Sequence, residues 1–288
     1  MLVIKELFYF WILLLVVFVA DIADGTEDEG YEYAEEFDDV WEYEEDEFEQ
    51  AELTEEEQEV QLEAELELME SDTVLWMNAT YAPLTYANGD DWRIVAGREK
   101  REENIAIVEY TLERDWGIYD RYSAIETIER LKENGHTKRF QELVSYWEGK
   151  PVGEDIRYES VEDMDEDTKA RALIVKEMMD AGYASDYIKA WDLCRVNQLY
   201  ADCYLLGYMT FEEAMDCSLE NSKKLQKMYN SWEDMVNAYM MGYRFWSCDL
   251  EYSEFGPTAF RYMCYEDLRD MYDSPYDIDW NHYLEKTW

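Results

Sequence analysis

The spacing of apolar residues predicts a series of amphipathic helices along most of the chain after residue 100. Aromatic and methionine side chains recur most densely from Ala190 to Trp246, at the spacing that places them on one face of a helix. No segment of this part shows a convincing alternation of apolar and polar residues, as a half-buried strand would. The pattern predicts an all-α fold, with a single compact domain of about seven to nine helices joined by short turns.

Capping residues and glycines indicate where these helices begin and end. Ser and Thr side chains can accept the free amides of a first helical turn, and a Glu three residues later completes a capping box. The residues expected to begin helices are Ser123 (with Glu126), Ser185, Thr210 (with Glu213) and Ser231. Glycine indicates helix ends at Gly117, Gly135 and Gly182. In the helix before Gly182, the side chains expected to face inward are Ala170, Leu173, Ile174 and Met178.

A hydrophobic segment at the N-terminus, residues 1–22, predicts a targeting or anchoring role. Leu7 to Ala20 is an uninterrupted apolar run that Lys5 precedes. Its length suits a signal-peptide core, but cleavage after Ala20 or Ala23 lacks the small residue required two positions earlier, so we favour an uncleaved membrane anchor. A cleaved signal peptide and a buried terminal helix are the alternatives. The early positive charge predicts that the domain lies outside the membrane or is secreted, with a cytoplasmic orientation as the alternative.

An acidic spacer, residues 23–72, is expected to follow. Between Lys5 and Arg93 there is no Lys or Arg, and like charges at this density repel one another, which predicts a largely disordered segment. Its interleaved aromatic residues leave a second interpretation, a linear motif that docks on a basic groove. Strong helix formers predict a helix at 54–70. The folded domain is expected at 73–288, with its aromatic C-terminal end packed back on it.

The charge balance limits the classes of partner. The chain has 70 Asp and Glu against 25 Lys and Arg, which gives a formal net charge of -45. Such a field repels nucleic acid and anionic lipid headgroups, and it attracts basic proteins. We therefore expect no nucleic-acid partner and membrane contact only through the N-terminal segment. The partner is expected to be an unidentified protein, for which a basic protein is the charge-complementary choice.

Four short blocks resemble a known protein family. They are WGIYDR at Trp116 to Arg121, NGH followed by TKRF at 134–140, AWDLCR at Ala190 to Arg195, and SWEDMVNAYMMGYRFW at Ser231 to Trp246. In this order they resemble the motif blocks of a bacterial family, the domain of unknown function numbered twelve sixty-six, which is also present in enteric bacteria. The resemblance covers roughly Leu75 to Trp246. It implies a helical domain, and it carries no established activity or cofactor.

A polar row on the helix that begins near Ala190 is the candidate binding site. Asp192, Arg195, Gln198 and Asp202 recur at spacings that place them near one another beside an apolar face. One interpretation is an ion pair of Asp192 with Arg195 that orients two helices. The other is a groove in which Arg195 binds an anionic group and aromatic rings form an apolar wall. The candidate groove residues are Trp191, Asp192, Arg195, Gln198, Trp232 and Tyr239.

Familiar signatures of catalysis are absent from the sequence. It contains no G-x-S-x-G elbow, no glycine-rich phosphate loop and no H-E-x-x-H. His136 and His282 lie far apart in sequence, and we interpret His136 as a structural residue that contacts helix-terminal carbonyls. No metal site and no cofactor are predicted. We therefore expect a noncatalytic, exported or membrane-tethered domain that binds a protein partner or a small ligand. The two alternatives are a hydrolase that uses clustered carboxylates and an acidic decoy that inhibits a basic protein.

The five cysteines bear on whether the domain lies in an oxidising or a reducing compartment. An odd number leaves at least one thiol unpaired in a monomer. Cys194 and Cys203 have apolar helical surroundings and are expected to be packed thiols. Cys248 and Cys264 flank a loop and are the candidate pair for a disulfide. Exported chains tend to pair their cysteines, so free thiols conflict with export unless the host lives without oxygen or the domain faces the cytoplasm.

Overall fold

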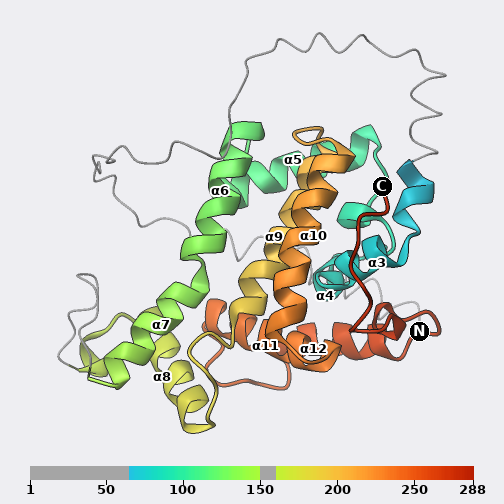
Figure 1. Cartoon of the computed structure of the whole chain (residues 1–288). Helices are drawn as coiled ribbons and strands as arrows, with labels where there is room; N and C mark the ends of the chain where they lie inside the picture. Colours follow the sequence, from blue (N-terminus) through green and yellow to red (C-terminus); the bar gives the residue numbers. More distant parts are fainter. Residues whose placement is uncertain (1–64, 150–159) are drawn as a thin grey trace, which may run out of the picture. The chain divides into compact units, whose positions relative to one another are not determined.

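Helix α9 (Lys189–Leu205) is the central element of the fold. The computed structural model describes residues 65–149 and 160–288. Within α9 every residue except Lys189 and Gln198 is buried. A helix that is buried all round has to be enclosed by other elements, and in Figure 1 it runs behind α10 through the middle of the described helices.

Nine further α-helices surround α9 in the described part of the chain. They are α3 (Asp72–Ala79), α4 (Ala82–Ala87), α5 (Glu102–Trp116), α6 (Arg121–Asn134), α7 (His136–Trp147), α8 (Glu166–Asp180), α10 (Phe211–Met228), α11 (Trp232–Trp246) and α12 (Pro257–Arg269). The short 3-10 helices are η1 (Val95–Gly97), η2 (Val161–Asp163) and η3 (Pro275–Asp277). Residues 65–149 and 160–288 contain no strand, which confirms the all-α prediction. The expected number of seven to nine helices is exceeded by one, because the described residues form ten α-helices, α3 to α12.

Helices α10 and α11 make the main contacts with α9. On α11, Gly242 faces Trp191, and a Cβ atom at Gly242 would overlap the Trp191 side chain. The absence of a side chain therefore allows α11 and α9 to approach closely at this point.

A buried polar network connects α3, α9 and α10. Asn197 on α9 donates to the hydroxyl of Ser222 at 2.9 Å and to the hydroxyl of Thr80 at 3.0 Å. Asn221 on α10 donates to the Asn197 side-chain oxygen at 2.7 Å and to the Leu193 carbonyl at 2.8 Å. Because buried amides are costly to leave without partners, this network fixes the register of the two long helices.

The C-terminal segment packs back on the domain, as expected. In Figure 1 it is the dark red trace that runs beside α10 toward α3. The indole N–H of Trp232 donates to the carbonyl of Ile278 at 2.7 Å, and that of Trp280 donates to the carbonyl of Tyr229 at 3.2 Å. Gln226 on α10 donates to the Trp280 carbonyl at 2.7 Å. Tryptophan N–H groups and an amide therefore hold a segment that has no regular secondary structure of its own.

Two predicted helix starts are confirmed and two differ. Thr210 forms a capping box with Glu213, and the Ser231 side chain accepts from the Asp234 amide. For α6 the N-cap is Asp120, and Ser123 completes the box from inside the helix instead of capping it. Ser185 caps no helix, because the residues before α9 form hydrogen-bonded turns and the helix begins only at Lys189.

The inward face of α8 is partly different from the predicted one. Ile174 and Met178 are buried as expected, but Ala172 and Val175 are buried in place of Ala170 and Leu173. Apolar residues flank the buried stripe on both sides, so helical spacing alone did not select between neighbouring faces.

The predicted anchor at 1–22 and the acidic spacer up to residue 64 lie outside the described residues. Residues 65–69 are helical, within the helix expected at 54–70. Among the helices that the structure describes, none has both the length and the apolar character that crossing a bilayer requires.

Candidate functional site

The structure places five of the six predicted groove residues in the core. Trp191, Asp192, Arg195, Trp232 and Tyr239 are buried, and only Gln198 is partly exposed.

The two tryptophans belong to different aromatic clusters. Trp191 packs against Tyr239, with ring centres 5.2 Å apart, and also against Tyr243 and Trp246. Trp232 packs against other rings, namely Trp76 at 4.8 Å, Trp280 at 4.9 Å and Tyr276 at 5.6 Å. These residues therefore serve internal packing and do not line one open groove.

The Asp192 carboxylate caps the N-terminus of α7. It accepts the backbone N–H groups of His136 and Thr137, each at 3.0 Å, and the Thr137 hydroxyl at 2.6 Å. Gly135 precedes α7, and a Cβ atom there would overlap the Asp192 carboxylate. The NGH block therefore provides a backbone without a side chain, so that a carboxylate from α9 can reach the free amides of another helix.

Arg195 completes this buried cluster. It donates to Asp192 at 3.1 Å and to the Trp191 carbonyl at 3.2 Å. Its guanidinium lies 4.2 Å from the centre of the Trp191 ring and 5.2 Å from that of Trp116 on α5. Burial raises the pKa of Asp192, but the charge of Arg195 and the hydrogen bonds from Thr137 outweigh it and hold that pKa well below its usual range. Asp192 and Arg195 thus form a buried, charged pair that connects α5, α7 and α9.

His136 has a different role from the one expected. It begins α7, and its imidazole contacts the Arg195 guanidinium, with 3.0 Å between Nδ1 and Nη2, instead of terminal carbonyls. Because an arginine can only donate, Nδ1 accepts and the proton lies on Nε2. Burial and the charge of Arg195 lower the pKa of His136, although Asp192 opposes this effect. The imidazole is therefore neutral at pH 7 and does not compete with Arg195 for Asp192.

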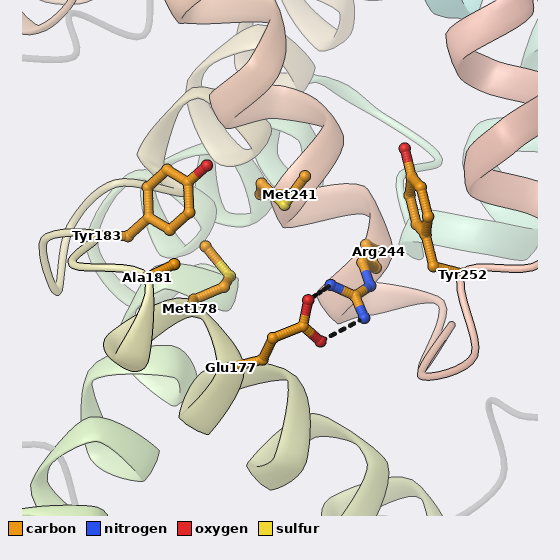
Figure 2. Close-up of a pocket in the computed structure, with 7 residues that line it drawn as sticks. All are labelled: Glu177, Met178, Ala181, Tyr183, Met241, Arg244 and Tyr252. Carbon is orange, nitrogen blue, oxygen red and sulfur yellow. Dashed lines mark hydrogen bonds and ion pairs between the residues drawn. The ribbon is translucent and has the colours of Figure 1, made fainter.

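A pocket opens between α8 and α11, next to the loop that follows α11 (Figure 2). It has a volume of about 300 Å³, and its lining residues are Glu177, Met178, Ala181, Tyr183, Met241, Arg244 and Tyr252. Figure 2 shows Tyr183 at one end and Tyr252 at the other, with the methionines and an ion pair between them. An apolar and aromatic lining with a few polar groups is typical of ligand sites.

Arg244 connects the walls of the pocket. It donates to both carboxylate oxygens of Glu177, at 3.0 and 2.8 Å, and its hydrogen bonds lower the pKa of that carboxyl. It also donates to the carbonyls of Asp249 at 3.0 Å and Leu250 at 3.1 Å. Its guanidinium lies 5.3 Å from the centre of the Tyr252 ring. One side chain of α11 therefore holds both α8 and the following loop in place.

The loop on this side of the pocket has an unusual backbone. Cys248 and Tyr252 have φ angles of 54° and 47°, in the left-handed region that residues other than glycine rarely adopt. Such conformations persist where surrounding contacts impose them, and they are concentrated at functional sites. The two carbonyls that Arg244 binds lie between these residues, so the pocket and the strained loop are one structural unit.

Helical spacing missed this pocket. Glu177 and Arg244 are 67 residues apart, and nothing in the sequence pairs them. One feature of the sequence could have indicated the pocket: Tyr183 directly follows Gly182, the glycine at the end of α8. In the structure Tyr183 is exposed, and its ring lies 4.5 Å from that of Tyr187 instead of entering the core.

The five cysteines are all free thiols. Cys194, Cys203 and Cys264 are buried. The sulfur of Cys248 lies 3.8 Å from the carbonyl of Asp167 on α8. Cys248 therefore faces α8 and not Cys264 on α12, and the predicted disulfide is not formed in this structure.

Asp202, the last member of the predicted polar row, is buried near the C-terminal end of α9. Burial raises its pKa to about 8, with smaller effects from the charges of Arg98, which lowers it, and Asp90, which raises it. Most Asp202 side chains are therefore protonated at pH 7. Across residues 65–149 and 160–288, no three His, Cys, Asp or Glu side chains are grouped so that they could hold a metal ion.

Replacing Asp192 by alanine is expected to destabilise the fold by on the order of 3–5 kcal/mol, because Arg195 stays buried without its carboxylate. Urea unfolding followed by circular dichroism measures the change. Asp180→Ala is the control, since Asp180 pairs with Lys176 on the surface, and it should alter the free energy of unfolding by less than about 0.5 kcal/mol. An equally small effect at Asp192 would contradict a structural role for the pair.

Replacing Asp202 by asparagine is expected to change how stability depends on pH. The folded protein keeps a proton up to pH about 8 that the unfolded chain releases near the ordinary pKa of 3.8, so rising pH lowers stability between these values. Asp202→Asn should therefore be more stable than the unchanged protein by more than about 1 kcal/mol near pH 8, and the difference should shrink toward pH about 4. Parallel urea-unfolding profiles across this range would refute the expectation.

Two uncharacterised proteins of Escherichia coli (strain K12) are similar to this chain. It is 25% identical to "Uncharacterized protein YbeR" over 143 residues, which are 48% of this chain and 57% of the relative. It is also 25% identical to "Uncharacterized protein YbeU" over 140 residues, which are 49% of this chain and 58% of the relative. The chain thus spans a little over half the length of these curated relatives. No solved structure matches it.

A family model described as "Protein of unknown function (DUF1266)" matches residues 111–280, more than half of the chain. All four sequence blocks lie inside this range, which confirms the resemblance that they suggested. The limits differ, because the match begins within α5 instead of at Leu75 and continues past Trp246 through α12. The chain therefore belongs to the DUF1266 family of proteins of unknown function.

Proposed function

We propose that this protein is a noncatalytic helical domain that binds a protein partner through the pocket between α8 and α11. The observation that carries the proposal is the pocket itself, with its two tyrosines, two methionines and single ion pair. Methionine and tyrosine side chains are adaptable contact surfaces for protein segments. The volume of about 300 Å³ is small for a ligand site and suits one inserted side chain of a partner.

The residues of the predicted groove lie in the core, where they support the helix that lines the pocket. Trp191 packs against Tyr243 and Trp246 on one face of α11, and the neighbouring residues Met241 and Arg244 line the pocket. In the proposal, Trp191 and its buried neighbours position α11, and the partner contacts the pocket.

The proposal also places the domain outside the membrane, tethered or released by the hydrophobic segment at 1–22. The free thiols are compatible with this placement. Burial raises the pKa of Cys203 to about 12 and that of Cys264 to about 11, and it also raises the pKa of Cys194, Cys217 and Cys248. Because thiolates and not thiols are readily oxidised, these cysteines are expected to stay reduced where disulfides form.

The hydrolase alternative has less support at this pocket. Paired-carboxylate hydrolysis needs two acids within reach of one substrate. Among the residues that line the pocket, Glu177 is the single carboxylate, and Arg244 binds both of its oxygens.

Blocking the pocket is expected to abolish capture of the partner. Ala181 and Ala184 are both exposed, and only Ala181 lines the pocket. Tagged full-length Ala181→Trp should lose, in a pull-down from host membranes read by mass spectrometry, proteins that the unchanged chain and the matched control Ala184→Trp retain. An unchanged set of proteins with Ala181→Trp would refute the proposal. A chain without residues 23–64, which keeps the described helices intact, should still capture the partner, whereas loss of capture would favour the acidic decoy.

The proposed orientation predicts that a protease can reach the domain from outside the cytoplasmic membrane. The domain should co-fractionate with the membrane or the medium, and a protease added outside cells or spheroplasts should digest it. A cytoplasmic marker protein tests that the membrane stays closed. Resistance of the domain until the cells are lysed would place it in the cytoplasm and refute export.

A further inference from the structure

We infer, on the basis of the proposed function, that the pocket between α8 and α11 accepts a basic side chain, an arginine or lysine of the partner. The pocket joins an exposed carboxylate, Glu177, to the aromatic ring of Tyr183 and to the methionines Met178 and Met241. This combination recognises a group that is cationic at its tip and apolar along its stem.

Arg244 does not make the pocket an anion site. Its hydrogen bonds to Glu177, Asp249 and Leu250 use four of the five N–H groups that a guanidinium carries. Its side chain is 5% exposed, whereas that of Glu177 is 60% exposed. An incoming ligand therefore meets the carboxylate before it meets the guanidinium.

The Glu177 carboxylate can bind a second cation. Each of its oxygens accepts one hydrogen bond from Arg244, and an ionised carboxylate has about four acceptor positions. The exposed side of the carboxylate thus keeps acceptor capacity toward the solvent. A basic side chain that bound there would complete a chain of alternating charges with Glu177 between two cations.

The tyrosines and methionines fit the same occupant. Arg244 already lies against the Tyr252 ring, at 5.3 Å, which shows that this site tolerates a cation over an aromatic face. At the other end, Tyr183 is 40% exposed and offers a second ring beside Met178 and Met241 (Figure 2). The methylene stem of an arginine or lysine can pack between these apolar groups while its charged end reaches Glu177.

The charge of the whole molecule favours this occupant over others. With 70 acidic against 25 basic residues, the chain repels an acidic segment and attracts a basic one. A purely apolar side chain would offer no hydrogen bond to the exposed side of the Glu177 carboxylate. It would therefore bind at that side no better than water does. A basic side chain can pack against the apolar walls of the pocket and also pair with the Glu177 carboxylate.

A titration of the full-length protein in detergent micelles tests the inference. The probe is a capped Gly-Arg-Gly peptide, and the matched control replaces arginine by citrulline, which has nearly the same shape and no charge. Methyl resonances of 13C-labelled methionine report occupancy, with Met178 and Met241 assigned by their replacement with leucine. The arginine peptide should shift these two resonances, the citrulline peptide should not, and added salt should weaken the effect.

Two tyrosine variants locate the binding. Tyr183→Leu keeps an apolar side chain but removes the ring, and it should weaken binding of the arginine peptide about five-fold. Tyr122→Leu is the matched control, because Tyr122 is an exposed tyrosine of α6 outside the pocket, and it should bind as the unchanged protein does.

The outcomes separate this inference from the proposed function. Equal shifts with both peptides would show that the pocket holds side chains without regard to charge, which overturns the inference and leaves the proposed function intact. The absence of shifts with either peptide would also overturn it, and the pull-down with Ala181→Trp would then decide the proposed function independently. Equal weakening by Tyr183→Leu and Tyr122→Leu would overturn the assignment of the cation to the pocket.

Discussion

The buried Asp192 carboxylate is the interaction on which the arrangement of the helices depends. It caps α7 from α9, pairs with Arg195, and lies 3.8 Å from the Lys189 ammonium, which itself binds the carbonyl of Lys132 at the end of α6. A charge in this position has to be compensated from several directions, because the surroundings provide little water. The approach of α6, α7 and α9 is therefore fixed by the position of one carboxylate.

The consequences of this cluster extend to the pocket through α11. Trp191, held against the Arg195 guanidinium, fits over Gly242, so that one face of α11 is set against α9. The adjacent face of α11 carries Met241 and Arg244, which line the pocket. The inner wall of the pocket is thus built on a helix that packs closely against α9.

Helical periodicity predicted the fold class, the central stretch and most helix ends, because amphipathic spacing and capping act over a few residues. It also predicted, as one interpretation, the ion pair of Asp192 with Arg195, because the two residues lie within one helical turn. It did not predict that Asp192 would cap α7, since Gly135 is far from it in sequence and its role appears only when the two helices meet. The same reason explains why Glu177 and Arg244 were missed, and why sequence spacing did not assign Trp191 and Trp232 to their separate aromatic clusters.

Several arginines of this acidic chain lie against aromatic rings. Arg195 lies over Trp191, Arg244 over Tyr252, and Arg261 over Tyr243 at 4.7 Å. Three of the 25 cations therefore contact aromatic rings in or next to the core. The guanidinium is suited to this role because it is planar and weakly hydrated. With 70 acidic against 25 basic residues, carboxylates remain in excess wherever these cations lie. The excess of acid therefore determines the sign of charge of the partner that the chain attracts, while these arginines serve the packing of the helices.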